Sequence, residues 1–183
     1  MVVEAKQYQR NGTKIIFPRL FGYTEEARRI KKSVTVKPVD RVQWNEEKFF
    51  QQARERLSKE ELEAVTKLFA FSKSNGFGTR WGTGKETGSF TIVESEIFSK
   101  SIISCYASGS IVLSIGGLKG NESIEKFRTD LANAVKGELG FSIPNDYIDK
   151  YPTIPALAWI KKVDILIDIV KNLIGQYKSS EKS

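Results

Sequence analysis

The chain of 183 residues has no histidine, one cysteine and no long apolar run, and each of these absences excludes a class of protein. Histidine is the usual general base and the commonest zinc ligand, so its absence removes histidine-based triads and most zinc sites. A single cysteine, Cys105, excludes an intrachain disulfide and a thiolate metal cluster. Its apolar neighbours predict a small core residue. Any catalysis must therefore use carboxylates, lysine or hydroxyl groups.

No apolar stretch approaches the roughly 20 residues that a membrane-spanning helix needs. Glu4 also comes too early for the apolar region of a signal peptide. With 40% hydrophobic and 28% charged residues, the composition is that of a globular protein. We therefore expect a soluble, cytoplasmic protein with no membrane partner.

The positive charge is concentrated at one end of the chain. The first 43 residues contain ten Lys or Arg and four Asp or Glu, whereas the rest is nearly neutral. A basic segment joined to a neutral body indicates a polyanionic partner, above all nucleic-acid phosphates. The alternative is that these side chains are only solvated. The residues expected to contact phosphates are Lys14, Arg19, Arg28, Arg29, Lys31 and Lys32.

The pattern of the N-terminal segment, residues 1–43, predicts a short β-hairpin followed by a helix. Residues 1–6 and 14–17 read as strands on either side of the turn signal Asn11-Gly12, and Pro18 is expected to end the pairing or to lie on an edge. A helix begins at Thr24. An extended connector over 34–39 leads to a domain boundary near Asp40.

Residues 44–178 read as an α+β module, and 179–183 as a polar tail. Helices are expected over 45–56 and after the capping box Ser58-Lys-Glu-Glu61. The period then changes from helical to two, which predicts a four-stranded antiparallel sheet covered by amphipathic helices. The expected strands are 77–81, 89–93, 102–106 and 110–115. A helix around 124–135 follows, and a last helix has the apolar stripe Leu157, Ile160, Val163, Ile167, Val170 and Ile174.

The glycine-rich segment 76–88 fails the tests for a phosphate-binding loop. A P-loop would need glycine where Thr79 stands and a hydroxyl residue where Glu86 stands. Turn chemistry between two strands explains these glycines. Trp81 is expected to pack on a helix, while Arg80 and Lys85 could present a basic rim to a small anionic ligand.

Glu4 and Lys6 form the pattern of an acidic residue and a lysine two positions apart at the end of an apolar strand. In nucleases of the PD-(D/E)XK type, such residues point into one site, where the acid binds a metal ion and the lysine holds the phosphate or the attacking water. The alternative is a solvated strand end. Mg²⁺ or Mn²⁺ would suit such oxygen ligands.

The stretch Val3-Glu-Ala-Lys-Gln-Tyr8 resembles the last catalytic strand of a PD-(D/E)XK nuclease-like domain. The rest is similar to a C-terminal module of unknown function that follows such domains in prokaryotic proteins. The segments that carry this resemblance are Trp44–Phe50, Arg80–Lys85, Gly88–Phe90, Gly109–Ile115, Ile143-Pro144 and Tyr151–Pro155.

The resemblance implies that Glu4 is a catalytic and metal-binding residue and that Lys6 is a catalytic residue, with Mg²⁺ as the cofactor. The three residues before Glu4 cannot supply the nuclease strands that carry the first metal-binding aspartate. The missing ligand would come from a partner or from further chain, so we expect no cleavage by this chain alone.

Two functions follow from these patterns. The first is a nucleic-acid-associated accessory protein, a truncated or degenerate metal-dependent nuclease. The second is a non-catalytic protein-interaction or oligomerisation module that docks through Phe17, Phe21 and Tyr23. Binding to phosphates would weaken steeply with salt, whereas an apolar interface would tolerate salt.

Overall fold

A computed structural model describes residues 2–10, 13–21, 42–95 and 99–180 of the chain. The chain divides into two compact units, Met1–Asp40 and Arg41–Ser183. The helix expected from Thr24, the connector over 34–39 and the last residues of the expected tail, 181–183, lie outside the described residues.

The first unit contains strands β1 (Val2–Arg10) and β2 (Thr13–Phe21), which pair antiparallel. Both strands are longer than predicted. Two residues separate them, so Arg10 pairs with Thr13 and the ladder continues while both segments stay extended. Pairing does not end at Pro18, which lies opposite Ala5. A two-stranded ladder tolerates proline because each strand has an outer side with no pairing requirement.

The second unit begins with two helices whose first turns are capped by side chains. In α2 (Glu46–Arg56), the Asn45 side chain accepts a hydrogen bond from the Lys48 amide at 2.9 Å. In α3 (Lys59–Ser74), Ser58 and Glu61 form the predicted capping box, with bonds of 2.8 and 3.3 Å. These bonds satisfy amide groups that the first turn of a helix leaves free. Local chemistry therefore fixes where both helices start.

The sheet has five strands rather than the four predicted. Its order is β3 (Gly78–Trp81), β4 (Ser89–Glu94), β5 (Lys100–Tyr106), β6 (Ile111–Leu113) and β7 (Thr153–Ile154), all antiparallel. The fifth strand was not predicted, because two residues between prolines carry no periodic signal. Proline is acceptable at a sheet edge, and the Pro152 carbonyl accepts a hydrogen bond from the Leu113 amide at 3.0 Å.

The C-terminal region differs from the predicted continuous helix. It consists of α5 (Ala156–Trp159), a 3₁₀ turn and α6 (Val163–Ser180). Leu157, predicted to be buried, is 82% exposed. Trp159 is buried instead, and its indole Nε1 donates to the Gly109 carbonyl at 2.9 Å. That bond directs α5 inward through Trp159, so Leu157 is left on the outer side.

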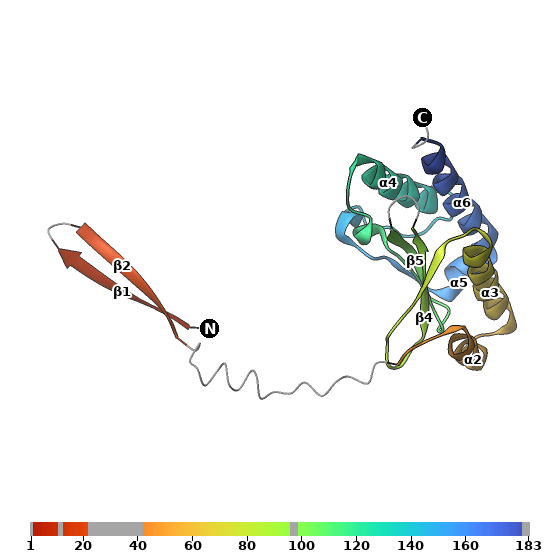
Figure 1. The fold of residues 1–183 in the computed structure, drawn as a ribbon, viewed down its shortest axis with the longest axis horizontal. Coiled ribbons are helices and arrows are strands. Elements are labelled where there is room, and N and C mark those ends of the chain that lie inside the picture. Colours follow the sequence, from red (N-terminus) through yellow and green to blue (C-terminus); the bar gives the residue numbers. More distant parts are fainter. Residues whose placement is uncertain (1, 11–12, 22–41, 96–98, 181–183) are drawn as a thin grey trace. The chain divides into compact units, whose positions relative to one another are not determined.

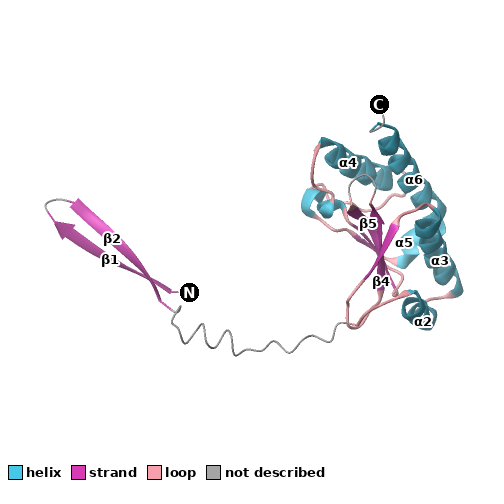
Figure 2. Cartoon of the chain, in the orientation of Figure 1, coloured by secondary structure: helices cyan, strands magenta, loops and turns pink. Residues whose placement is uncertain are grey.

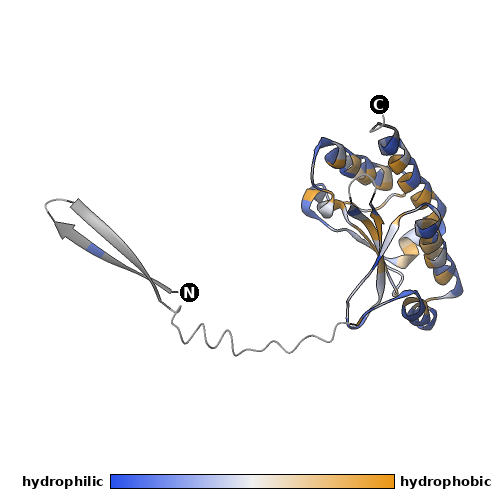
Figure 3. Ribbon diagram, in the orientation of Figure 1, coloured by the Kyte–Doolittle hydropathy of each residue, from blue (hydrophilic) through white to orange (hydrophobic). Residues whose placement is uncertain are grey.

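Helices α3, α5 and α6 are drawn on one side of strands β4 and β5 (Figure 1, Figure 2), and α3 contacts both α6 and strand β3. Helix α4 (Glu122–Gly137) packs against α6, where the rings of Phe127 and Tyr177 meet at 5.3 Å between centroids. Hydrophobic residues are concentrated in the strands and along the helices of this unit (Figure 3). Among the helices of the described ranges, none has the length and apolar character needed to cross a bilayer.

One face of the sheet forms the core. Phe90 of β4 contacts Phe49 and Phe69, each at 5.1 Å between ring centroids. Trp81 also packs on these two helix residues, at 5.9 and 5.7 Å, which confirms its predicted contact with a helix. Cys105 is fully buried on the same face, as predicted. Burial raises the pKa of its thiol, so the neutral form is favoured.

A β-bulge in β5 explains why two consecutive isoleucines are fully buried. Ile92 pairs with Ile103, but Val93 pairs with Ser101, so Ile102 is an extra residue in the ladder. Ile102 and Ile103 are both 0% exposed. A bulge of this kind changes the direction of side chains and bends the strand. Ser101 and Ser104 consequently lie together on the face of the sheet opposite to these two isoleucines.

Candidate functional site

The predicted catalytic pair lies in the first unit. Glu4 and Lys6 belong to β1, where they pair with Arg19 and Phe17 of β2. Register therefore brings Arg19 next to Glu4 in the ladder. Within the described residues there is no group of three or more Asp, Glu, Cys or His that could hold a metal ion.

Two of the six predicted phosphate-contacting residues lie in described strands. Lys14 pairs with Gln9, and Arg19 pairs with Glu4. The other four, Arg28, Arg29, Lys31 and Lys32, lie outside the described residues.

The glycine-rich segment between β3 and β4 is held by side chains of α2 and by Trp44. The Trp44 indole donates to the Gly84 carbonyl at 2.6 Å, and Gln52 both donates to the Glu86 carbonyl and accepts from the Gly88 amide. A Cβ atom on Gly88 would lie 2.6 Å from the Trp44 ring, so glycine is required for this close approach. These contacts fit the interpretation of the segment as a structural turn.

Of the two predicted rim residues, Arg80 lines a hollow of the described residues and Lys85 does not line that hollow. Arg80 of β3 points to the outer face of the sheet, where it lines a hollow of about 490 Å³. Lys85 is exposed in the turn and is not among the residues that line this hollow. The expected pair of rim cations is therefore replaced at this hollow by Arg80 and Lys100.

This hollow, the open-face pocket, follows strand β5 on the side of the sheet away from the aromatic core. Its lining is rich in hydroxyl groups and contains two cations and two tyrosines but no carboxylate. The lining residues are Arg80, Ser99, Lys100, Ser101, Ser104, Tyr106, Val112, Ser114, Gly117 and Tyr151. Its volume lies within the range of small-ligand sites, and several polar groups line it.

The register of the sheet shows which residues form the middle of the open-face pocket. Arg80, Thr91, Ser104, Val112 and Thr153 are successive partners across all five strands. Side chains that are direct partners lie on the same face of a sheet. The hydroxyl groups of Thr91 and Ser104 are 2.7 Å apart and hydrogen-bonded, which fixes the direction of Ser104 in this row.

One wall of the open-face pocket is formed by the segment that carries Tyr151. A Cβ atom on Gly116 would lie 2.7 Å from the Asp149 carbonyl carbon and 2.9 Å from the Tyr151 ring, so only glycine permits this contact. The Gly116 amide donates to the Lys150 carbonyl at 2.7 Å. Lys119 also bonds to the Asp149 carboxylate, and this bond lowers the pKa of Asp149. Three contacts thus hold the wall in place.

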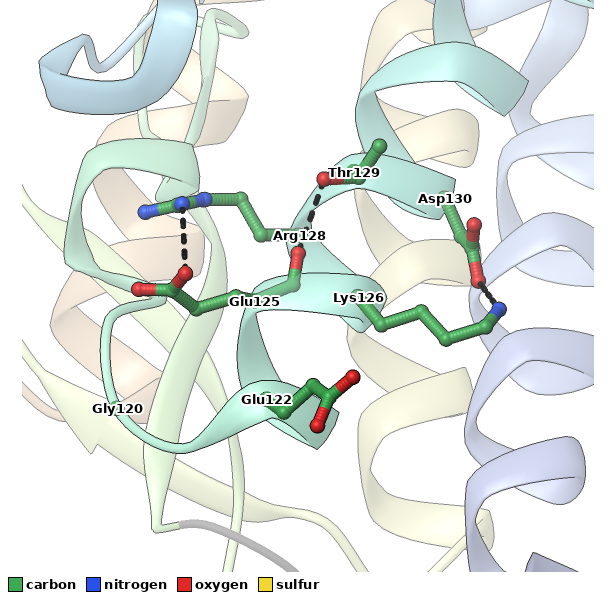
Figure 4. A pocket seen from close by; sticks show the side chains of 7 residues that line it. All are labelled: Gly120, Glu122, Glu125, Lys126, Arg128, Thr129 and Asp130. Carbon is green, nitrogen blue, oxygen red and sulfur yellow. Dashed lines mark hydrogen bonds and ion pairs between the residues drawn. The ribbon is translucent and has the colours of Figure 1, made fainter.

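A second hollow lies along the first half of α4 and has a different character (Figure 4). Its charged side chains are mostly paired with one another: Lys126 bonds Asp130 at 2.6 Å, and Arg128 lies 3.7 Å from the Glu125 carboxylate. The hydrogen bond that Lys126 donates to Asp130 raises the pKa of Lys126. Tyr177 of α6 also donates to Asp130, at 3.3 Å. These contacts join α4 to α6.

No protein-family model, curated protein or solved structure matches this chain. The candidate site therefore rests on the geometry and chemistry of its own residues.

Sequence reasoning identified only Arg80 among the residues of the open-face pocket. It missed Lys100 and Tyr106, which lie at the two ends of β5, and Tyr151, which lies in the segment before β7. The alternation of Ser104 and Tyr106 with the buried residues of β5 was an available signal. The adjacent Ile102 and Ile103 obscured it, because both faces of the strand looked apolar.

Proposed function

We propose that this chain is a nucleic-acid-associated accessory protein whose basic N-terminal unit contacts phosphates. The observation that carries this proposal is the coincidence of charge with the division of the fold. The unit Met1–Asp40 has nine Lys or Arg and four Asp or Glu, whereas the unit Arg41–Ser183 has twenty and eighteen. A charge excess concentrated in one unit favours a polyanionic partner for that unit.

In this proposal, phosphates are bound by Lys14, Arg19, Arg28, Arg29, Lys31 and Lys32. Such contacts supply affinity without reading sequence, and each releases counterions from the nucleic acid. Binding should therefore be similar for different sequences and should weaken steeply with salt.

The same proposal includes the nuclease strand. Glu4 would be the metal-binding residue and Lys6 the phosphate-positioning residue of a truncated or degenerate PD-(D/E)XK site, with Mg²⁺ as the metal. The missing acidic ligand would come from a partner or from further chain. This chain by itself is not expected to cleave nucleic acid.

The test is fluorescence anisotropy of labelled single- and double-stranded DNA and RNA with the full chain at two salt concentrations. The test variant replaces Arg28, Arg29, Lys31 and Lys32 with Glu. A control variant makes the same change at four exposed lysines of the second unit, Lys59, Lys136, Lys161 and Lys171. Both variants change the net charge equally, so they separate a local effect from a global one.

We expect the test variant to lose affinity by at least about 100-fold at low salt, because four phosphate contacts are removed. The same change should make the affinity depend less steeply on salt. The control variant should lose far less. Equal losses in both variants would mean that only net charge matters. No binding by the wild-type chain at low salt would overturn the proposal.

A second candidate is the non-catalytic protein-interaction or oligomerisation module. It is favoured by large apolar side chains at the surface, since Leu157 is 82% and Ile148 is 50% exposed. Such residues could form an apolar interface on the second unit, and Phe17, Phe21 and Tyr23 could form a separate one on the first unit. Association that persists at high salt, measured by light scattering, would support this candidate.

A further inference from the structure

The open-face pocket has a charge that its surroundings do not neutralise. Its lining contains Arg80 and Lys100, and neither forms an ion pair with another residue of the described ranges. Glu94, the partner of Lys100 in the ladder, has a carboxylate that is 2% exposed and lies 3.7 Å from Lys178 of α6, so Arg80 rather than Lys100 is the cation that the register places on the outer face. The acid next to the pocket is thus paired on the helix side of the sheet. An anionic ligand would supply the missing countercharge.

The pocket also carries two tyrosine rings along its length. Tyr106 is half-buried at the end of β5, and Tyr151 is 55% exposed beside Gly117. An exposed tyrosine ring is a surface on which a planar group can stack. Cations and aromatic rings in one groove are the combination that binds unpaired nucleic acid, because phosphates meet the cations and bases stack on the rings.

The length of the pocket agrees with this chemistry. It follows β5 from Lys100 to Tyr106, which at about 3.3 Å per residue is roughly 20 Å. Sheets that bind single-stranded RNA stack two or three bases on aromatic side chains of their exposed face. A double helix could not use these rings, because its bases are already paired and stacked.

We propose that the open-face pocket binds two or three unpaired nucleotides, with phosphates at Arg80 and Lys100 and bases against Tyr106 and Tyr151. This inference deepens the proposed function and rests on it: the basic N-terminal unit would supply affinity for any nucleic acid, and the pocket would select unpaired strands. Ser101, Ser104 and Ser114 offer hydroxyl groups to sugars or base edges.

The first test locates the ligand by amide chemical shifts of the ¹⁵N-labelled full chain. The probes are hexathymidylate, hexauridylate, a DNA hairpin duplex and inorganic phosphate. We expect the two single strands to shift the amide signals of Thr91, Ser104 and Val112, and the duplex to leave them unchanged. Comparison of the two hexamers distinguishes DNA from RNA as the source of the nucleotides. If neither hexamer moves these signals at saturating concentration, the proposal is wrong. Equal shifts with inorganic phosphate alone would show that the pocket is a simple anion site and would overturn the proposal of nucleotide binding.

The second test uses matched variants in the anisotropy assay with the labelled hexamers. Arg80→Gln and Lys100→Gln should each weaken single-strand binding by about fivefold, while Lys85→Gln, which removes an exposed cation outside the pocket, should change it less than twofold. Tyr151→Leu should weaken binding by about tenfold because stacking on a ring is lost, whereas Tyr151→Phe keeps the ring and should retain it. Equal effects of the Lys85 and Arg80 variants would contradict the pocket.

The two proposals fail in distinguishable ways. The N-terminal charge variant should weaken single strands and duplexes alike, whereas the pocket variants should weaken single strands only. If the pocket variants have no effect while the charge variant does, the proposed function stands and the pocket assignment falls. If the charge variant has no effect and the amide shifts persist, the pocket binds nucleotides without the N-terminal unit.

Discussion

The two faces of the five-stranded sheet are built from the same strands but have opposite chemistry. The inner face carries Phe90, Ile103 and Cys105, all fully buried against the helices. The outer face carries Arg80, Ser104 and Tyr106, which remain accessible around a hollow. Since neighbouring residues of one strand lie on different faces, a change of one position moves a substitution from core to surface. Function is therefore to be sought on the outer face, and stability on the inner face.

The largest contrast is expected from cysteines placed on each face of β5. Cys105 is fully buried and burial raises its thiol pKa, so it should react with a thiol reagent only when the unit unfolds. In a Cys105→Ala background, the cysteine of Ser104→Cys should be labelled at least about a thousandfold faster than Cys105 of the wild type, because the reagent can reach it without unfolding of the unit. Labelling rates followed in native buffer and in denaturant provide the measurement. Similar native rates for the two cysteines would show that β5 opens readily.

The next effect concerns the free energy of unfolding. Phe90→Ala should destabilise the second unit by about 3–5 kcal/mol, because it removes a buried ring in contact with Phe49, Phe69 and Trp81. Thr91→Ala, one position along on the outer face, should cost about 1 kcal/mol or less, mainly from its bond to Ser104. Urea unfolding followed by circular dichroism gives both values. A loss at Thr91 as large as at Phe90 would mean that the outer face is also part of the core.

The smallest effect is a dependence of stability on pH at the wall of the open-face pocket. Lys119 lowers the pKa of Asp149, so this carboxylate contributes stability above its unfolded pKa of about 3.9 and loses it as the pH falls through the folded value. Asp149→Asn should lower the melting temperature at pH 7 by about 1–2 °C, as expected for an exposed ion pair. The wild type and the variant should converge in acid. A difference that stays constant down to pH 2 would exclude this carboxylate as the cause.

The parts of the fold that were predicted are those fixed by local chemistry. The Ser58–Glu61 capping box is readable in the sequence because the two residues that make it are three positions apart. The change to a period of two predicted an antiparallel sheet in an α+β fold, although the sheet has five strands and not the four expected. In contrast, the two-residue strand β7 exists only because Leu113 and Pro152 are brought together by the tertiary fold. Leu157 was misplaced because the bond from Trp159 to Gly109 joins residues 50 positions apart.

The residues of the candidate site were also predictable only where local sequence fixed them, and not where the tertiary fold did. Arg80 stood in a short strand and was noted as a basic residue that could meet a ligand. Its partners Lys100 and Tyr151 approach it only when β3, β5 and the segment before β7 are assembled. Which face of β5 is accessible depended on the bulge at Ile102, and a bulge has no fixed signature in one sequence.

Ile102 is one residue more than the ladder needs. Because pairing is in phase on both sides of it, deletion of this residue would leave Ser101 and Ser104 on the face they now occupy. The strand would become straighter, since the bulge is what bends it. The curvature of this surface and the identity of its side chains can thus vary independently. Deletion of a single codon could therefore change the shape of the outer face without changing the residues that would contact a ligand.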